Sequence, residues 1–105
     1  MEAYQKKYLA KYGKPPESIM DALGYDLAMV VQAAVTKAGS IDPAKIRAAL
    51  ADLENVQGAT AIISYKGGNG TPARPVVIIR IEGGKRVLAS RKLPDPAIVP
   101  APRLN

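Results

Sequence analysis

The feature that most constrains this chain is a long apolar stretch between Ser18 and Gly39. Apolar residues recur there with the period of an α-helix, which predicts a single helix with a continuous apolar stripe. The stripe consists of Ile19, Leu23, Leu27, Val31, Ala34, Val35 and Ala38. Further apolar residues outside it are Met20, Ala28, Met29, Val30 and Ala33. A helix that is apolar on most of its sides has to be covered by more than one neighbouring element.

Both ends of this helix carry sequence signals. Ser18 and, three residues later, Asp21 fit a capping box. Gly39 stands where a left-handed C-terminal cap is expected. Gly24, in the interior, costs about 1 kcal/mol relative to Ala, so we expect another segment to pack close to it.

A membrane-spanning helix is the competing interpretation of this stretch. A span needs about 20 consecutive apolar residues. The polar residues that interrupt every window of that length here are Asp21, Asp26 and Gln32. We therefore expect a buried helix of a globular domain. Of the neighbouring pair in its first half, we expect Tyr25 to pack between helix and sheet with its hydroxyl bonded, and Asp26 to be a carboxylate on the helix surface.

Composition limits the chemistry that this chain can perform. Its 105 residues are enough for one small domain, and they include no His and no Cys. Disulfides, zinc sites built from Cys or His, thiol nucleophiles and histidine bases are therefore excluded. The carboxylates show no spacing typical of a paired acid and base, and the glycine-rich loop at residues 67–70 does not match a phosphate-binding loop. We predict a protein that is not an enzyme, with no catalytic residue, metal ligand or cofactor.

The chain carries a net charge of +6, from 15 Lys and Arg against 9 Asp and Glu. Such a charge can attract nucleic acid, so a small basic interaction module that binds nucleic acid or a protein partner is an alternative function. Surfaces that bind single-stranded nucleic acid usually require aromatic residues interleaved with the basic ones, and the basic cluster near the last strand has none. That cluster consists of Lys85, Arg86, Arg91 and Lys92. Surface charge for solubility is the simpler interpretation, and we expect no nucleic-acid partner.

Two shorter helices are predicted beside the central one. Residues 2–12 form an amphipathic pattern whose tyrosines share a face typical of a core or an interface, with stacking on a ligand as the alternative role. These tyrosines are Tyr4, Tyr8 and Tyr12. Residues 43–53 predict a third helix, with Asp42 as N-cap and Pro43 in the first turn. The start of the chain is charged and lacks the apolar segment of a signal peptide.

The second half of the chain predicts strands. After a turn at residues 56–58, strands are expected at residues 59–65, 75–82 and 86–91. The continuous apolar run of the second strand indicates burial on both faces, and Gly83-Gly84 indicates a hairpin. The order is three helices followed by two or three strands. As an isolated unit this is an α+β fold with a small sheet, whose apolar faces need further neighbours.

The order of several short motifs resembles one known family. YLAKYGKPPE is followed by ALGYDLAMVVQAAVTKAGSIDPAKIRAAL, by QGATAIISY, and by the strand pair PVVIIRIEGGKRV. Together these words cover nearly all of residues 4–88. They resemble the C-terminal portion of the type I periplasmic solute-binding proteins, and more narrowly the branched-chain amino acid (Leu/Ile/Val) binding family of ABC importers.

The resemblance implies an α/β fold of two lobes joined by a hinge, with a small solute bound in the cleft between them. It implies that residues 1–92 are a C-terminal segment of that fold, about its last third, and that residues 93–105 are a Pro-rich extended tail. It also implies a periplasmic location, an amino-acid-like ligand bound by the complete protein, and ABC permease subunits as partners.

In that family the start of the central helix approaches the cleft. The position about five residues before the Tyr of GYD is Met20, and the resemblance implies that Met20 lines the pocket for the side chain of the substrate, with Asp21 beside it. The competing interpretation is that Met20 fills core space. We expect the isolated chain to bind no ligand, because half of the cleft is missing, and to form homo-oligomers through its uncovered apolar faces.

Overall fold

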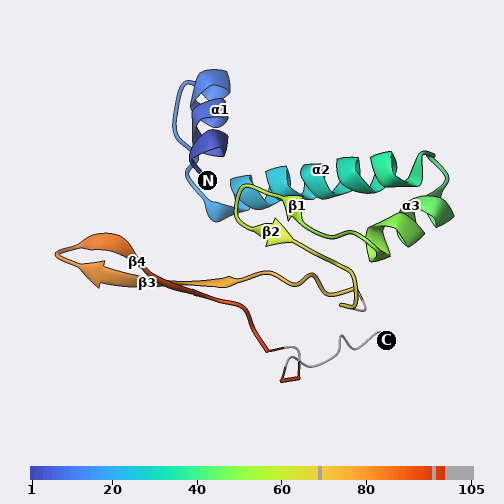
Figure 1. Ribbon diagram of the computed structural model, residues 1–105. Coiled ribbons are helices and arrows are strands. Elements are labelled where there is room, and N and C mark those ends of the chain that lie inside the picture. Colours follow the sequence, from blue (N-terminus) through green and yellow to red (C-terminus); the bar gives the residue numbers. More distant parts are fainter. Residues whose placement is uncertain (69, 96, 99–105) are drawn as a thin grey trace.

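The computed structural model describes residues 1–68, 70–95 and 97–98. Its elements follow the predicted order of helices and then strands (Figure 1). The helices are α1 (Glu2–Tyr12), α2 (Ile19–Ala38) and α3 (Pro43–Ala51). The strands are β1 (Val56–Gln57), β2 (Ile62–Ile63), β3 (Val76–Glu82) and β4 (Lys85–Lys92). The mixed α/β character of the chain is therefore confirmed.

The helix ends form as the capping residues predict. At the start of α2 the Ser18 hydroxyl accepts a hydrogen bond from the Met20 N–H at 3.1 Å, and the Asp21 carboxylate accepts one from the Ser18 N–H at 3.1 Å. Gly39 ends the helix with φ 58°, in the left-handed region. The Asp42 carboxylate accepts from the Lys45 N–H at 3.0 Å and starts α3.

The core lies where α2 meets α3 and the short β1–β2 pair. Six buried residues form it: Val30, Ala34, Leu53, Val56, Ala61 and Ile63. The strands pair antiparallel, with Val56 opposite Ile63. The first strand was predicted over residues 59–65; the structure reduces it to Ile62–Ile63, which pairs with a segment predicted as a turn. The turn prediction at residues 56–58 is therefore wrong for β1.

The row of residues that α2 buries differs from the apolar stripe that the sequence pattern indicates. The buried residues of α2 are Ala22, Asp26, Val30 and Ala34. Of the predicted stripe, Ile19, Leu27 and Val31 are 55%, 64% and 51% exposed, whereas Ala34, which belongs to both rows, is buried. Both rows repeat every fourth residue, so periodicity alone could not choose between them. As expected from a helix that needs more neighbours than this chain supplies, α2 keeps an apolar face that the described residues leave exposed.

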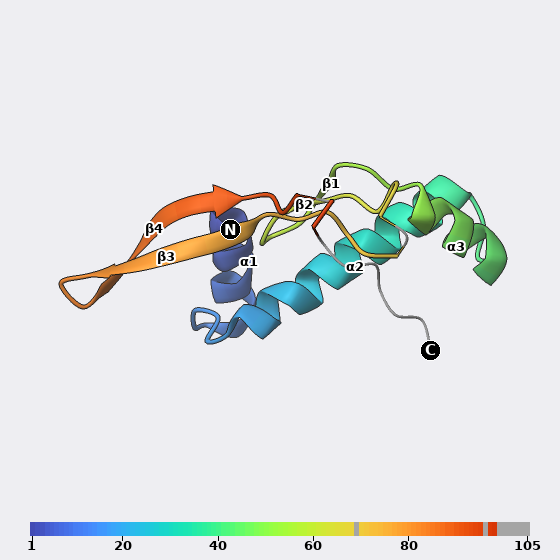
Figure 2. The same cartoon turned by 90° about the horizontal axis from the view of Figure 1, so that it is seen from below.

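The third and fourth strands form a hairpin that projects away from the helices (Figures 1 and 2). β3 and β4 pair antiparallel from Glu82–Lys85 to Val76–Lys92, with a bulge between Ile78 and Ile79. Gly83 and Gly84 make the turn with φ 55° and 77°. Every residue of β3 is exposed. The burial on both faces that the apolar run indicates does not form here, because no element of the described residues covers either face. This agrees with the expectation that the sheet needs further neighbours.

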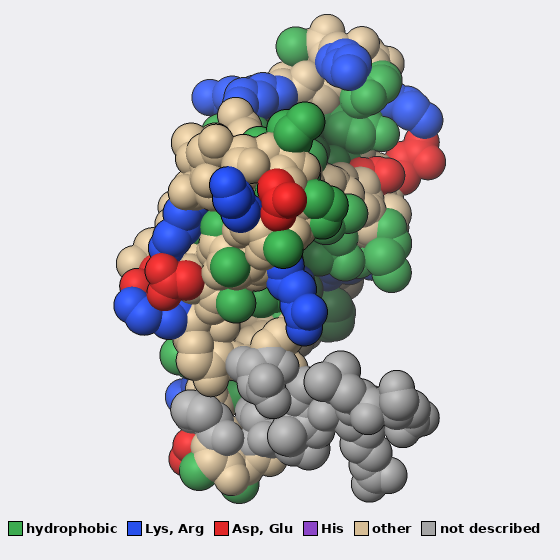
Figure 3. Space-filling view, turned by 90° about the vertical axis from the view of Figure 1, so that its right-hand side faces the viewer, with side chains coloured by type: hydrophobic (Ala, Val, Ile, Leu, Met, Phe, Trp, Pro, Cys, Tyr) green, Lys and Arg blue, Asp and Glu red, His purple; other side chains and the backbone are tan. Residues whose placement is uncertain are grey.

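The overall shape is correspondingly open. The Cα radius of gyration is 16.1 Å, against about 13 Å for a compact domain of about 100 residues. The extents are 49 × 38 × 25 Å. On the face viewed from the α3 end, hydrophobic side chains lie on the surface beside Lys and Arg (Figure 3). The described residues therefore form two small buried clusters and leave large apolar faces exposed.

α2 also has the length and composition of a membrane span, with a mean hydropathy of 1.3 in its most apolar window. The core helix of a soluble protein can have the same properties, so this similarity is weak evidence. The row of α2 that faces the rest of the chain includes the carboxylate of Asp26. Most of the predicted tail lies outside the described residues; residues 93–95 and 97–98 contain no helix or strand.

Candidate functional site

The first turn of α2 holds the two residues that the sequence places near a ligand. Met20 is 69% exposed, so it does not fill core space in this chain. The Asp21 carboxylate accepts hydrogen bonds from the backbone N–H groups of Glu17 and Ser18, at 3.2 and 3.1 Å. Its negative charge thus lies at the positive end of the helix dipole. The two neighbours have different surroundings: Met20 faces outward and Asp21 lines a cavity.

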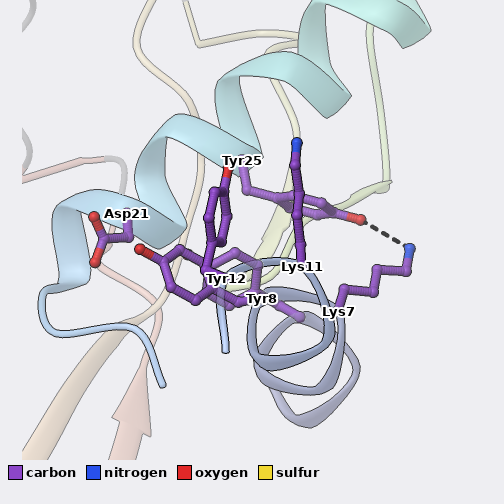
Figure 4. A pocket seen from close by; sticks show the side chains of 7 residues that line it. Lys7, Tyr8, Lys11, Tyr12, Asp21 and Tyr25 are labelled. Carbon is purple, nitrogen blue, oxygen red and sulfur yellow. Dashed lines mark hydrogen bonds between the residues drawn. The ribbon is translucent and has the colours of Figure 1, made fainter. Parts of the chain in front are cut away.

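That cavity lies between α1 and the first half of α2 (Figure 4) and has a volume of about 380 Å³. We call it the aromatic pocket. It is lined by Tyr4, Lys7, Tyr8, Lys11, Tyr12, Asp21 and Tyr25. Four of the five tyrosines of the chain are therefore gathered in one place. The tyrosine face of α1 is evident from the sequence, whereas a cavity against it is not.

The tyrosine rings contact one another at angles intermediate between stacked and perpendicular. Ring centroids are 5.2 Å apart for Tyr4 and Tyr25, 5.8 Å for Tyr4 and Tyr8, and 4.6 Å for Tyr8 and Tyr12. Such tilted pairs are favourable beyond their buried area by about 0.5–1.5 kcal/mol. Tyr25 thus packs against α1 rather than against a sheet, which corrects the packing predicted for it.

The polar groups of the pocket are unevenly satisfied. The Lys7 ammonium donates to the Tyr25 hydroxyl at 3.2 Å, as the dashed line in Figure 4 shows. The predicted hydrogen bond of the Tyr25 hydroxyl is thereby confirmed. The Tyr4 hydroxyl is buried and has no hydrogen-bond partner among the described residues. Burial raises the pKa of Tyr4, and the negative charge of Asp21 raises it further, so this hydroxyl stays protonated.

Asp26 is the most buried polar residue of the described chain, with 3% exposure. Its carboxylate accepts hydrogen bonds from the Ala59 N–H at 2.5 Å and from the N–H and hydroxyl of Thr60. Arg74 donates to the same Thr60 hydroxyl at 3.0 Å. The prediction that Asp26 is a surface carboxylate is wrong, because the turn after β1 supplies the donors that pay for its burial.

Ion pairs at the other end of α2 lie on the surface. Lys37 contacts Asp52 at 2.7 Å, and Lys66 contacts Glu54 at 3.0 Å. The hydrogen bond and the charge of Lys37 lower the pKa of Asp52, while the hydrogen bond from Lys66 to Glu54 raises the pKa of Lys66. Exposed pairs of this kind contribute little stability individually. In the described part of the chain, no three His, Cys, Asp or Glu side chains are grouped so that they could hold a metal ion.

Comparison with known proteins identifies the family. A sequence model described as "Periplasmic binding protein" matches residues 1–85. The chain belongs to this family. Among solved structures, this periplasmic binding protein is similar to the leucine binding protein LivK from Thermotoga maritima MSB8, with 33% sequence identity and a TM-score of 0.69. No curated protein matches the chain.

The match to LivK covers 86% of this chain and 25% of LivK. The chain thus spans about a quarter of the length of the periplasmic binding protein that it resembles. The sequence resemblance and the α/β fold class are confirmed, since three helices and two small antiparallel sheets match part of a lobe of that fold. In LivK, three quarters of the chain lie outside the matched region.

Proposed function

We propose that this chain is part of the solute-binding component of an ABC importer for branched-chain amino acids or similar small solutes. In this role it binds its solute without catalysis, outside the cytoplasm, and delivers it to permease subunits. The observation that carries the proposal is the similarity to a leucine binding protein at 33% identity over 86% of the chain. The absence of His and Cys agrees with binding rather than catalysis.

Within this function, we propose that Met20 lines the wall of the solute cleft, with Asp21 beside it. The side chain of Met20 is 69% exposed on the first turn of α2. An unbranched thioether can adapt to substrate side chains of different shape. The uncovered face of α2 and the apolar β3–β4 hairpin support an arrangement in which the rest of the two-lobed fold completes this cleft.

A chimera tests the proposal. Residues 1–92 replace the aligned segment of LivK, and calorimetry measures the binding of leucine, isoleucine and valine. We expect saturable binding by the folded chimera and none by the isolated chain, which supplies only part of a cleft. A chimera that unfolds cooperatively but binds none of the three amino acids, nor any other amino acid, would contradict the solute-binding proposal.

Two substitutions in the chimera test the role of Met20. Met20→Lys places a charge on an apolar wall, so we expect the affinity to fall at least about tenfold. Ile41→Lys is the matched control, because Ile41 is also an exposed apolar residue, at 88% exposure, and lies beyond the far end of α2. Equal affinities for the two variants would show that Met20 is not in the wall.

A further inference from the structure

We propose that the aromatic pocket between α1 and α2 is a binding site for a small aromatic carboxylate. This site is a different cavity from the proposed cleft surface on which Met20 lies, although Asp21, next to Met20, lines it. The inference does not rest on the function proposed above. Its volume of about 380 Å³ falls within the range of small-molecule sites, about 300–1,000 Å³, which are likewise mostly apolar with a few placed polar groups.

The charges of the pocket favour an anion. Lys7 and Lys11 line it, and neither forms an ion pair within residues 1–68, 70–95 and 97–98. Asp21, the one acidic residue in the lining, is held by two backbone N–H groups at the start of α2. In Figure 4 Asp21 lies across the tyrosine rings from the two lysines. A carboxylate on the lysine side would therefore lie near an ammonium group, of Lys7 or of Lys11, and away from the carboxylate of Asp21.

A cationic ligand is the alternative for a cage of tyrosines, since aromatic faces attract ammonium groups. In this pocket two lysine ammonium groups already lie near the tyrosine rings. The Lys7 ammonium is 5.7 Å from the centre of the Tyr25 ring, and the Lys11 ammonium is 5.3 Å from the centre of the Tyr12 ring. An added cation would be repelled by both. The geometry thus selects an anion.

The rings favour an aromatic ligand body. Four tilted tyrosines present both faces and edges, to which a flat ring can pack in the same offset manner as they pack to each other. The Tyr4 hydroxyl adds a donor: Tyr4 is 6% exposed and its hydroxyl has no partner among the described residues. A ligand oxygen that accepts from this hydroxyl would satisfy a buried polar group.

The test uses the full chain and 4-hydroxybenzoate as the probe, with tyrosine ring resonances followed by NMR. We expect saturable shifts for Tyr4, Tyr8, Tyr12 and Tyr25 and none for Tyr65, which packs against the core cluster instead. The uncharged 4-hydroxybenzyl alcohol and the cation benzyltrimethylammonium should bind at least about tenfold more weakly. Equal binding of either analogue, or no saturable shift at millimolar probe while circular dichroism shows the helices formed, would overturn the proposal.

Substitutions locate the site. The double variant Lys7→Met and Lys11→Met should weaken 4-hydroxybenzoate about tenfold, because it removes both ammonium groups from exposed positions on α1. Lys45→Met, on α3, removes an equivalent charge away from the pocket and should leave binding unchanged. Tyr4→Phe should weaken binding about fivefold, and the control Tyr65→Phe should not. A double lysine variant that binds as the wild type does would place the anion elsewhere and contradict the site.

Discussion

The contact between Asp26 and Gly58 shows how a single side chain fixes the backbone around it. A Cβ added at Gly58 would lie 2.6 Å from an Asp26 carboxylate oxygen and 2.9 Å from the Ala61 carbonyl oxygen. Only glycine permits so close an approach of the turn to the carboxylate. Asp26 of the GYD motif therefore contacts Ala59 and Thr60 of the QGATAIISY motif, although the two motifs are about thirty positions apart in the sequence.

This contact predicts opposite effects for two glycine substitutions. Gly58→Ala should lower the free energy of unfolding by about 1–3 kcal/mol, because neither the buried carboxylate nor the backbone can move away. Gly24→Ala should raise it by about 1 kcal/mol, since no atom of the described residues outside the helix lies within 4 Å of the added methyl group and alanine favours the helix. Urea unfolding followed by circular dichroism measures both. Similar values for the two variants would contradict the contact.

Gly24 and Gly58 also show what the sequence could not reveal about single residues. The expectation of close packing at Gly24 is wrong, and the tight position is Gly58. Helical periodicity locates a glycine within a helix but does not say which segment passes by. The signal that could have found the contact was a charged residue in an otherwise apolar helix, together with a glycine turn that leaves its N–H groups without partners.

Among the elements, those determined by neighbouring residues were predicted best. The helices have almost the expected bounds, because Ser18, Gly39 and Asp42 act on the backbone next to them. The β3–β4 hairpin follows in the same way from Gly83-Gly84. β1 and β2 form by pairing between separate segments, and the packing of α3 and β1 determines which row of α2 is buried. The local sequence pattern therefore predicts neither these strands nor the buried row.

The α2–α3 pair should respond to acid through one ion pair. Lys37 in the last turn of α2 holds Asp52, the C-cap of α3, and lowers its pKa below the ordinary value of 3.8. A carboxyl group with a lowered folded-state pKa stabilises the fold above the unfolded pKa, and this contribution is lost as the pH falls through the folded pKa. As the pH is lowered from about 5 to about 2, the midpoint of urea unfolding should therefore fall less in Lys37→Met than in the wild type. Identical profiles would contradict the pairing.

At the scale of the whole molecule, the chain has more apolar surface than it can cover. β3 is exposed throughout, and Ile79 and Leu27 are 54% and 64% exposed on separate faces. The sequence indicated this from a strand with apolar residues on both sides and a helix with too many. It indicated Met20 and Asp21 as site residues through the family resemblance. The aromatic pocket was not predicted, because it depends on how α1 rests against α2.

The uncovered faces predict self-association of the isolated chain. Light scattering should show oligomers that increase with concentration, because both the hairpin edge and the α2 face can be shared between copies. The double variant Leu27→Lys and Ile79→Lys should shift the population toward monomer, whereas the control Ile41→Lys should not. A stable monomer of the wild type at high concentration that does not bind the apolar dye ANS would contradict this prediction.

The tyrosines of the aromatic pocket also join α1 to the rest of the molecule: Tyr4 packs with Ala22 and Ala59, and Tyr8 and Tyr25 lie against them. If α1 detaches from the rest of the molecule, the pocket is lost with it, so a single equilibrium governs the docking of α1 and the presence of the pocket. Any molecule held among these rings would be thermodynamically linked to helix docking, so that occupancy and the resistance of the Gly13–Glu17 linker to proteases would rise together.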